Sequence, residues 1–351
     1  MNRRGYIDWL RGIAVLIMIE AHILDAWTRV DARSGTAYRL AIAIGGFGAP
    51  TFLFLAGIAM ALAAGRRRNG TATPAKIAAR ARSRGWQILG LALLFRLQSW
   101  LISGGEPSRT LMKVDILNVM GVAMLLASAL GGFGRARWTR ALTYSCSAVA
   151  LAMLTPIVFS THVIDFLPDQ LEWYLRPGSG VTTFAVFPWA GFLLAGGAVG
   201  IWLEAAGTDR EERRVILGLA VLGPLVALGG YAASLLPPIY AQTEFWTSSP
   251  TFFFVRLGVL ISALPIAHAW NALVPGRSPL REFGIASLFV YWIHVEMVYG
   301  VVSLPLHRQL PLDIALTACA GFSLFLFGLV KLRDRLVSSK SAKHVFQNAI
   351  R

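Results

Sequence analysis

Residues 8–27 read DWLRGIAVLIMIEAHILDAW, a stretch in which apolar side chains outnumber all others. At a rise of about 1.5 Å per residue, a helix of this length crosses a hydrocarbon layer of about 30 Å. Because hydrocarbon offers backbone N–H and C=O groups no partner, a segment that enters it must satisfy them internally, as a helix does. The stretch therefore predicts a membrane-spanning first helix.

Similar apolar segments recur along the chain of 351 residues, of which 56% are hydrophobic and only 15% are charged. A soluble domain has about 25% charged residues, so the composition indicates a membrane protein. We expect spans at residues 8–27, 41–64, 86–103, 114–131, 141–159, 182–204, 214–236, 251–274, 284–303 and 312–332. The predicted fold class is an all-α polytopic transmembrane helix bundle with about ten helices.

The basic residues give this bundle a predicted sidedness. With the N-terminus inside, 24 of the 33 Lys and Arg residues fall in inner segments and 7 in outer loops. Both termini are then cytoplasmic, and we expect the protein in the cell inner (plasma) membrane. We expect one transmembrane domain over residues 1–335 and a basic cytoplasmic tail over residues 336–351. Because the basic residues occupy short loops between spans, the net charge of +15 does not indicate a nucleic-acid partner.

Several common signals are missing from the sequence. Arg3 and Arg4 precede the first span as in a signal peptide, but the span carries charges and no small-residue cleavage site follows, which predicts that it is retained. Cys146 and Cys319 lie inside apolar segments, so we expect neither a disulfide nor a metal site. No zinc, Walker or dinucleotide spacing occurs either.

The first span carries a stripe of ionisable side chains, formed by Asp8, Arg11, His22 and Asp25. At 100° per residue these four positions project onto a sector about 100° wide. Arg11 and His22 are about 16 Å apart along the helix axis, with Arg11 nearer the cytoplasm. Asp25 follows His22 by three residues and can reach and orient its imidazole.

Charged groups are costly within a bilayer, so the stripe favours a functional role. His22 is suited to general-base chemistry near neutral pH, with Asp25 fixing its tautomer. Arg11, beside Asp8, could hold a phosphate-bearing donor at the cytoplasmic end. A structural alternative stays open, in which Asp8 and Arg11 are interfacial anchors and His22 is a satisfied histidine of the bundle.

Six further residues are candidates for substrate or donor binding: Arg96, Asp115, Asn118, Trp189, Arg256 and His294. Structural alternatives exist here too, because the two arginines can snorkel or pair and Asp115 can simply begin a helix. Tyr291 shares a helix face with His294. The predicted outer loops 160–181 and 237–250 are aromatic, which is typical of an interfacial belt and would also suit stacking of a sugar.

The spacing Arg11-x10-His22 resembles the signature of membrane acyltransferases of the acyltransferase-3 type. More widely, the chain is similar to the family of heparan-α-glucosaminide N-acetyltransferase catalytic domains and their bacterial relatives. The segments that carry this resemblance are DWLRG at 8–12, APTFLFLAG at 49–57, VDILNVMGVAMLL at 114–126, FPWAGFLLAGG at 187–197 and SLFVYWIH at 287–294.

This resemblance implies a multi-pass enzyme that moves an acyl group, typically acetyl, from cytoplasmic acetyl-CoA to a hydroxyl or amino group of a sugar or glycolipid on the far side. By motif match, His22 would be the catalytic histidine and Arg11 would lie near the donor. One departure matters, because the lysosomal heparan enzyme carries its catalytic histidine in the outer loop after the first span. Residues 28–40 contain no histidine, so either His22 supplies that role, as in the acyltransferase-3 pattern, or the chemistry has changed.

The expected partners are acyl-CoA, a glycan or glycolipid acceptor and membrane lipids, and a homodimer is compatible with the sequence. Acetyl-CoA would be a co-substrate, and no permanently bound cofactor is expected. His22 could act as a general base or be acylated transiently itself. A small-solute or lipid transporter or flippase is the alternative function, and it would need inverted repeats and discontinuous helices. A structural or sensor protein would leave the stripe of the first span unexplained.

Overall fold

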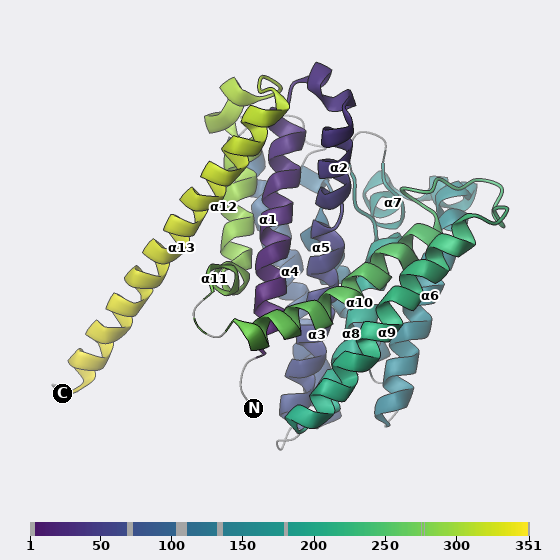
Figure 1. Ribbon diagram of the computed structural model, residues 1–351, viewed down its shortest axis with the longest axis horizontal. Coiled ribbons are helices and arrows are strands. Elements are labelled where there is room, and N and C mark those ends of the chain that lie inside the picture. The colour runs from purple at the N-terminus through teal and green to yellow at the C-terminus, as the bar shows by residue number, and fades with distance from the viewer. Residues whose placement is uncertain are drawn as a thin grey trace. The chain divides into compact units, whose positions relative to one another are not determined.

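A computed structural model describes residues 4–349 apart from 69–72, 103–110, 132–135, 179–181, 275 and 277 (Figure 1). Every regular element in these residues is a helix, which confirms the all-α class. The extended pairing found in the described chain is a single bridge between Thr28 and Leu310.

Six helical segments of the described chain are long and apolar enough to cross a bilayer. They are Thr36–Gly65, Arg137–Ser160, Val186–Ala205, Asp209–Ser234, Pro250–Leu273 and Leu312–Ser338. Each overlaps one predicted span, so the chain is a helical membrane protein. The total of ten spans and the cytoplasmic location of both termini stay predictions.

The other four predicted spans are also helical, but they are shorter or more polar. Three of them correspond to α1 (Gly5–Trp27), α4 (Pro74–Ile102) and α5 (Ile116–Leu130). The fourth, 284–303, is not the continuous helix that its apolar sequence suggested. It is interrupted at Ala286, between α11 (Pro279–Ile285) and α12 (Ser287–Tyr299).

Contacts within the chain define two compact units. Unit 1 comprises Met1–Gly48 with Leu273–Arg351, and unit 2 comprises Ala49–Ala272. The evenly spread hydropathy of the sequence gave no sign of such a division. The single domain expected over residues 1–335 stays a prediction.

Unit 1 is built around α1, which packs against α2 (Thr36–Gly45), α11, α12 and α13 (Leu312–Ala349). Short 3-10 segments, η1 (Val30–Ser34) and η4 (Val301–Leu306), follow α1 and α12. Where α1 crosses α11, a methyl group added at Gly12 would overlap the Leu280 carbonyl, and one added at Gly284 would overlap the Asp8 carbonyl. Glycine at both positions is therefore what lets the two backbones touch.

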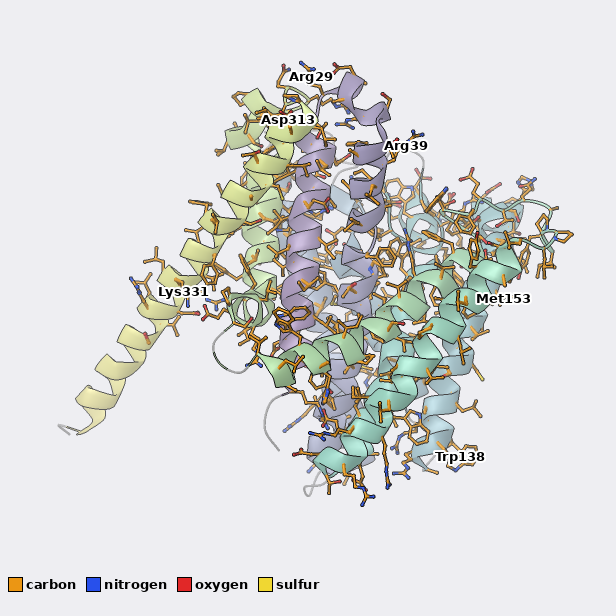
Figure 2. All side chains as sticks on the ribbon, viewed as in Figure 1. Arg29, Arg39, Trp138, Met153, Asp313 and Lys331 are labelled. Atoms are coloured by element: carbon orange, nitrogen blue, oxygen red, sulfur yellow. The ribbon has the colours of Figure 1, made fainter. Side chains whose placement is uncertain are left out.

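The interruption at Ala286 changes the direction of the chain in unit 1. Figure 1 shows α11 nearly end-on, whereas α12 is seen along its length. The helix α13 runs without a break to Ala349, so most of the expected basic tail has a helical backbone. Arg29 and Asp313 mark the predicted outer end of unit 1 in Figure 2, and Lys331 lies farther along α13, where it pairs with Glu282 of α11.

Unit 2 consists of α3 (Gly48–Arg68), α4, α5, α6 (Arg137–Ser160), η3 (His162–Phe166), α7 (Asp169–Leu175), α8 (Val186–Ala205), α9 (Asp209–Ser234) and α10 (Pro250–Leu273). Its centre is α8, which contacts α5, α6, α7 and α9 and is buried almost continuously between Ala190 and Ile201. The side chains of α8 itself are apolar around nearly the whole circumference of the helix, as expected of a helix in a core. Figure 2 places Trp138 and Met153 towards opposite ends of α6.

Candidate functional site

Two histidines join the polar stripe of α1 to α12. Nδ1 of His22 lies 2.8 Å from Nε2 of His294, and the ring planes differ by 13° with their centres 5.1 Å apart. In an imidazole with ring bonds of about 1.3–1.4 Å, each nitrogen lies about 1.1 Å from the ring centre. Adding this length for both rings to the nitrogen–nitrogen distance gives about the observed separation of the centres, so the two centres and the two nitrogens lie nearly on one line. The rings therefore meet edge to edge in one plane, which is the geometry of a hydrogen bond and not of face-to-face stacking.

The surroundings of the pair decide where its protons reside. Nδ1 of His294 lies 2.8 Å from the carbonyl oxygen of Val290, which can only accept a hydrogen bond. In a neutral His294 the proton is therefore on Nδ1, and the lone pair of Nε2 accepts from Nδ1–H of His22. It follows that Nε2 of His22 is unprotonated when both rings are neutral. Within the described residues, this nitrogen has no hydrogen-bond partner.

The two rings differ in their access to the surroundings. His294 has an exposed fraction of 0%, whereas His22 is only partly buried. A buried polar group needs its hydrogen bonds satisfied, and His294 has both ring nitrogens bonded. His22 is consequently the histidine whose free lone pair another molecule can reach.

Asp25 and Tyr299 complete this cluster in unit 1. The hydroxyl of Tyr299 donates to Oδ2 of Asp25 at 2.8 Å, and its ring meets His22 edge-on with centres 5.5 Å apart. In the described chain the hydrogen-bond partner of His22 is His294, so Asp25 does not bond to the imidazole directly as the sequence suggested. Tyr291 packs edge-on against His294 at 5.9 Å, in agreement with their predicted shared face.

The end of α1 that carries His22 is fastened to its neighbours by several hydrogen bonds. The indole of Trp27 donates to the Val298 carbonyl at 3.1 Å, and the Leu310 amide donates to the Trp27 carbonyl at 2.9 Å. The guanidinium of Arg33 donates to the Asp25 carbonyl at 2.6 Å. The bond to Val298 ties α1 directly to α12, the helix that carries His294, and the other two tie the end of α1 to the segments beside it.

Arg11 and Asp8 lie towards the other end of α1. Their side chains form an ion pair with a nitrogen–oxygen distance of 3.3 Å, and the Asp8 side chain is only 8% exposed. At eleven residues from His22, Arg11 is about 16 Å away along the axis. The structure keeps these two members of the predicted stripe apart, as the helical spacing requires.

In unit 2, Asp115 has two structural roles. Its carboxylate pairs with Arg96 at 3.0 Å and accepts hydrogen bonds from the Leu117 and Asn118 amides at 2.9 and 3.2 Å. The Asn118 side chain in turn accepts from the Asp115 amide at 3.1 Å. This reciprocal capping box begins α5. Asp115 therefore has the structural role considered for it in the sequence, that of starting a helix.

The remaining candidates of unit 2 connect to this cap. Asn118 donates to the Tyr174 hydroxyl at 3.1 Å, and Tyr174 packs with Trp189 against a cluster of Val114, Val119 and Trp173. The guanidinium carbon of Arg256 lies 5.8 Å from the centre of the Trp189 ring and 4.0 Å from that of Phe252. One continuous set of contacts thus joins five of the predicted residues: Arg96, Asp115, Asn118, Trp189 and Arg256.

The predicted site residues therefore form three groups: His22, Asp25 and His294 in unit 1, the Asp8–Arg11 ion pair towards the other end of α1, and the cluster of unit 2. Tyr299 and Tyr174 belong to these clusters but were not among the candidates. Tyr174 could have been noticed, because it lies in the aromatic loop 160–181 near the predicted end of a span. Tyr299 had a weaker signal, namely a tyrosine at the predicted outer end of the span that contains His294.

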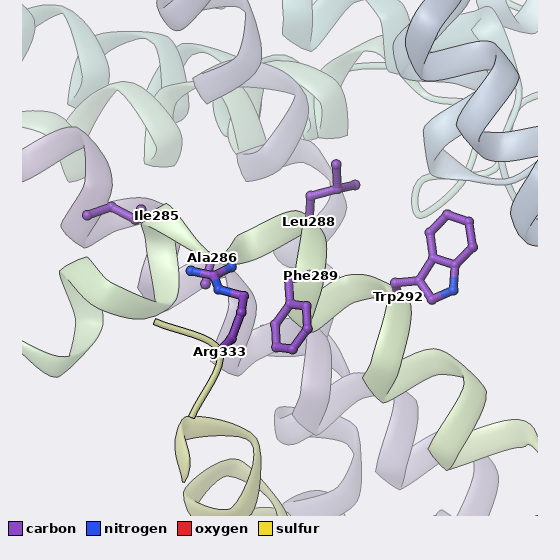
Figure 3. A pocket seen from close by; sticks show the side chains of 6 residues that line it. All are labelled: Ile285, Ala286, Leu288, Phe289, Trp292 and Arg333. Atoms are coloured by element: carbon purple, nitrogen blue, oxygen red, sulfur yellow. The ribbon is translucent and has the colours of Figure 1, made fainter. Parts of the chain in front are cut away.

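An open groove of about 410 Å³ lies at the interruption between α11 and α12 (Figure 3). Ile285, Ala286, Leu288, Phe289, Trp292 and Arg333 line it. The guanidinium of Arg333 stands 5.0 Å from the centre of the Phe289 ring and pairs with Asp334 at 2.7 Å. Apolar walls and one cation suit an amphiphilic molecule, although the pairing with Asp334 already satisfies part of the charge.

The predicted outer loop 160–181 contains a small charged network. Arg176 pairs with Asp165 and donates to Glu172 at 2.8 Å, while His162 lies 3.1 Å from Asp165. The hydrogen bonds from Arg176 and His162 hold the pKa of Asp165 below its ordinary value. This network stabilises the loop that carries α7 and Tyr174.

Apolar helices of spanning length, together with an accessible imidazole held by a second one, define a polytopic membrane protein with a site suited to proton transfer. Residues 3–237 match the family described as heparan-alpha-glucosaminide N-acetyltransferase, catalytic. The match covers about two thirds of the chain, which therefore belongs to this family and is a membrane protein of the acyltransferase type. Among individual curated proteins, none matches the chain significantly.

The matched region contains His22 and four of the five segments that carried the resemblance. Arg256 and His294 lie beyond it, so their roles depend on the geometry described above.

Proposed function

We propose that this protein transfers an acyl group, in the first instance acetyl, from cytoplasmic acyl-CoA to a hydroxyl or amino group of a sugar or glycolipid on the outer side of the inner (plasma) membrane. Family membership supports the transferase class. The observation that carries the proposal is the coplanar His22–His294 pair, which leaves one imidazole nitrogen accessible and unprotonated.

In the proposed reaction, Nε2 of His22 takes the proton of the acceptor as its oxygen or nitrogen attacks the thioester carbonyl carbon. The new C–O or C–N bond forms, the C–S bond breaks, and the sulfur leaves as the CoA thiolate, which is protonated on departure. His22 is then an imidazolium that still donates through Nδ1 to His294, with the Asp25 carboxylate nearby to favour the positive charge.

Arg11 is proposed to bind a phosphate of the donor. Guanidinium groups form charge-assisted, often bidentate hydrogen bonds with phosphates, and the ion pair with Asp8 restrains the side chain of Arg11. A donor held there must extend about 16 Å along α1 for its thioester to reach His22.

The transporter alternative has two observations in its favour: the interruption at Ala286 within the predicted span 284–303, and the break between α2 and α3 at residues 46–47 within the predicted span 41–64. Discontinuous helices line the substrate sites of many transporters. Family membership favours the transferase, and the two functions differ in their products, because transport moves a solute without modifying it.

The test compares wild type with His22→Ala in detergent, using radiolabelled acetyl-CoA and a panel of glycan and glycolipid acceptors. We expect His22→Ala to lower transfer by about 10²–10⁴-fold while acetyl-CoA binding is kept. His162→Ala is the matched control, because His162 is an exposed histidine of the loop and bonds only to Asp165 in the described chain. Wild-type turnover by His22→Ala would refute the mechanism.

Two further measurements separate the roles. Arg11→Ala should weaken acetyl-CoA binding, and unchanged affinity would remove Arg11 from the donor site. Acid-quenched wild-type enzyme, labelled without acceptor, should carry no acetyl group if His22 is a base. A label that disappears in His22→Ala would show instead that His22 is acylated.

A further inference from the structure

Unit 2 contains a cation that has no ion pair among the residues the structure describes. We propose that Arg256, with the aromatic side chains around it, forms a binding site for a monoanionic oxyanion, a phosphate ester or a carboxylate, carried by an amphiphilic ligand at the membrane surface. This site is separate from the chemistry proposed for His22, and its existence does not depend on acyl transfer.

The charges of unit 2 lead to this inference. Arg96 and Asp115 neutralise each other at 3.0 Å. Arg256, in contrast, has no ion pair and no hydrogen bond within the described residues. Its Nε, like that of Arg96, is buried without a hydrogen-bond partner. Because an isolated charge inside a membrane protein is costly, an unpaired arginine at this position calls for a ligand.

The aromatic neighbours of Arg256 leave its hydrogen-bond donors unused. Phe252 precedes Arg256 by one helical turn and lies 4.0 Å from the guanidinium carbon, and Trp189 lies 5.8 Å away. Such contacts offset part of the desolvation of the cation. They make no hydrogen bonds with the five N–H groups in the guanidinium plane, which match the two oxygens of a carboxylate or phosphate.

The location of the cluster identifies the kind of ligand. Arg256 is about 9 Å from the start of α10, Trp189 lies in the first turn of α8, and Asn118 in the first turn of α5. By the distribution of positive charge, these helix starts face the outer surface. The phosphate or sugar of an amphiphile lies at this depth, and the partly exposed rings of Trp189 and Tyr174 can pack against a sugar.

Snorkelling is the structural alternative for an arginine near a membrane surface. Nε of Arg256 is buried beside two rings, whereas its two terminal nitrogens are not among the buried atoms without a partner, so the end of the guanidinium is open to a ligand as well as to water. The comparison of anionic with neutral probes below distinguishes a ligand site from snorkelling.

The experiment measures binding of three octyl probes to the full protein in phosphatidylcholine nanodiscs, without acyl-CoA. Octyl phosphate and octyl β-D-glucuronide carry the anion, and octyl β-D-glucoside is the neutral reference. We expect wild type to bind at least one anionic probe ten-fold or more tightly than the glucoside, because hydrogen bonds to charged groups contribute at this level.

Arg256→Gln should abolish this preference, and Arg256→Lys should keep part of it, since lysine retains the charge but not the planar donors. Arg137→Gln is the matched control, because Arg137 also lies beside a tryptophan, 5.7 Å from the Trp202 ring, but at the opposite end of unit 2. It should leave the preference unchanged. Trp189→Leu keeps Arg256 but removes the ring proposed to pack against a sugar. It should weaken the binding of octyl β-D-glucuronide and octyl β-D-glucoside to the same extent, which tests the site in a variant whose cation is intact.

Preference for octyl phosphate alone would identify a phosphate ester as the natural group, and preference for the glucuronide alone would identify a carboxylate. A wild type that does not distinguish anionic from neutral probes would overturn the proposal, as would a preference that persists in Arg256→Gln. Because no acyl transfer is measured, failure of the proposed function would not affect this result.

Discussion

The polar clusters of the two units satisfy their polar groups in different ways. In unit 1, the histidines form a hydrogen-bond chain that begins at an accessible ring and ends at a backbone carbonyl. In unit 2, Arg96 pairs with Asp115, which also caps α5, whereas Arg256 has no ion pair among the described residues. The first arrangement provides a free lone pair and the second a free cation. The difference suggests that unit 1 contributes proton transfer and unit 2 contributes recognition of an anion.

The largest effect that would sharpen this comparison is expected at His294. Replacing it with leucine removes the acceptor of Nδ1–H of His22, so the tautomer that exposes Nε2 is no longer fixed. We expect His294→Leu to lower kcat about 100-fold with little change in KM for acetyl-CoA, since loss of a tautomer-fixing partner is costly in catalytic histidines.

A purely structural role of His294 would reduce the amount of folded enzyme but leave its pH–rate profile unchanged. His294→Gln supplies an amide oxygen as acceptor and should restore part of kcat. Equal activity of the leucine and glutamine variants would contradict the positioning role.

A second test concerns the crossing of α1 and α11, which holds the stripe of unit 1 in place. Gly12→Ala puts a methyl group against the Leu280 carbonyl and should lower the free energy of unfolding by about 1–3 kcal/mol, as overpacking does. Gly218→Ala, on α9 of unit 2, meets no atom within 4 Å and should be neutral or slightly stabilising. Denaturant titration in detergent compares them, and equal effects would show that the close approach is unimportant.

A smaller effect is expected in unit 2 at Asn118, where the structure provides a capping role. Asn118→Ala removes the reciprocal cap of α5 and the hydrogen bond to Tyr174. We expect the free energy of unfolding to fall by about 1 kcal/mol, with turnover following the folded fraction. A loss of turnover beyond that fraction would restore the binding role that the sequence suggested for Asn118.

The smallest effect is a pH dependence in the outer loop. The pKa of Asp165 is depressed in the folded protein, so its contribution to stability is complete above its unfolded pKa of about 4 and is lost as the pH falls through the folded value. Melting temperatures between about pH 3 and pH 6 should therefore fall more steeply for wild type than for Asp165→Asn. Parallel curves would mean that the carboxylate of this network contributes nothing measurable.

The elements and the stripe of α1 could be predicted because they depend on local properties. Apolar runs of spanning length define helices whatever their neighbours, and the helical repeat alone places Asp8, Arg11, His22 and Asp25 on one face. The capping role considered for Asp115 was equally local, since an acidic residue at the start of an apolar run satisfies the free amides there.

The partners of these residues could not be predicted, because they come from distant parts of the chain. His22 and His294 are 272 positions apart, and no periodicity connects them. The interruption at Ala286 was missed because the sequence stays apolar across it, and the glycine two residues earlier, Gly284, is no stronger a signal than a glycine tolerated within a helix. Arg256 was recognised as a cation within a span, but that none of the described residues pairs with it is known only from the folded chain.

The carbonyl of Val290 has a consequence for the energy metabolism of the cell. A carbonyl oxygen can accept a hydrogen bond but has no proton of its own to pass on, so the chain of bonds from His22 stops at α12. Along this chain of hydrogen bonds, a proton taken up at Nε2 of His22 has no way past the Val290 carbonyl and returns through the same nitrogen. If His22 exchanges a proton with a substrate as proposed, this chain of bonds does not carry that proton across the bilayer, and the reaction draws nothing from the electrochemical gradient by this route.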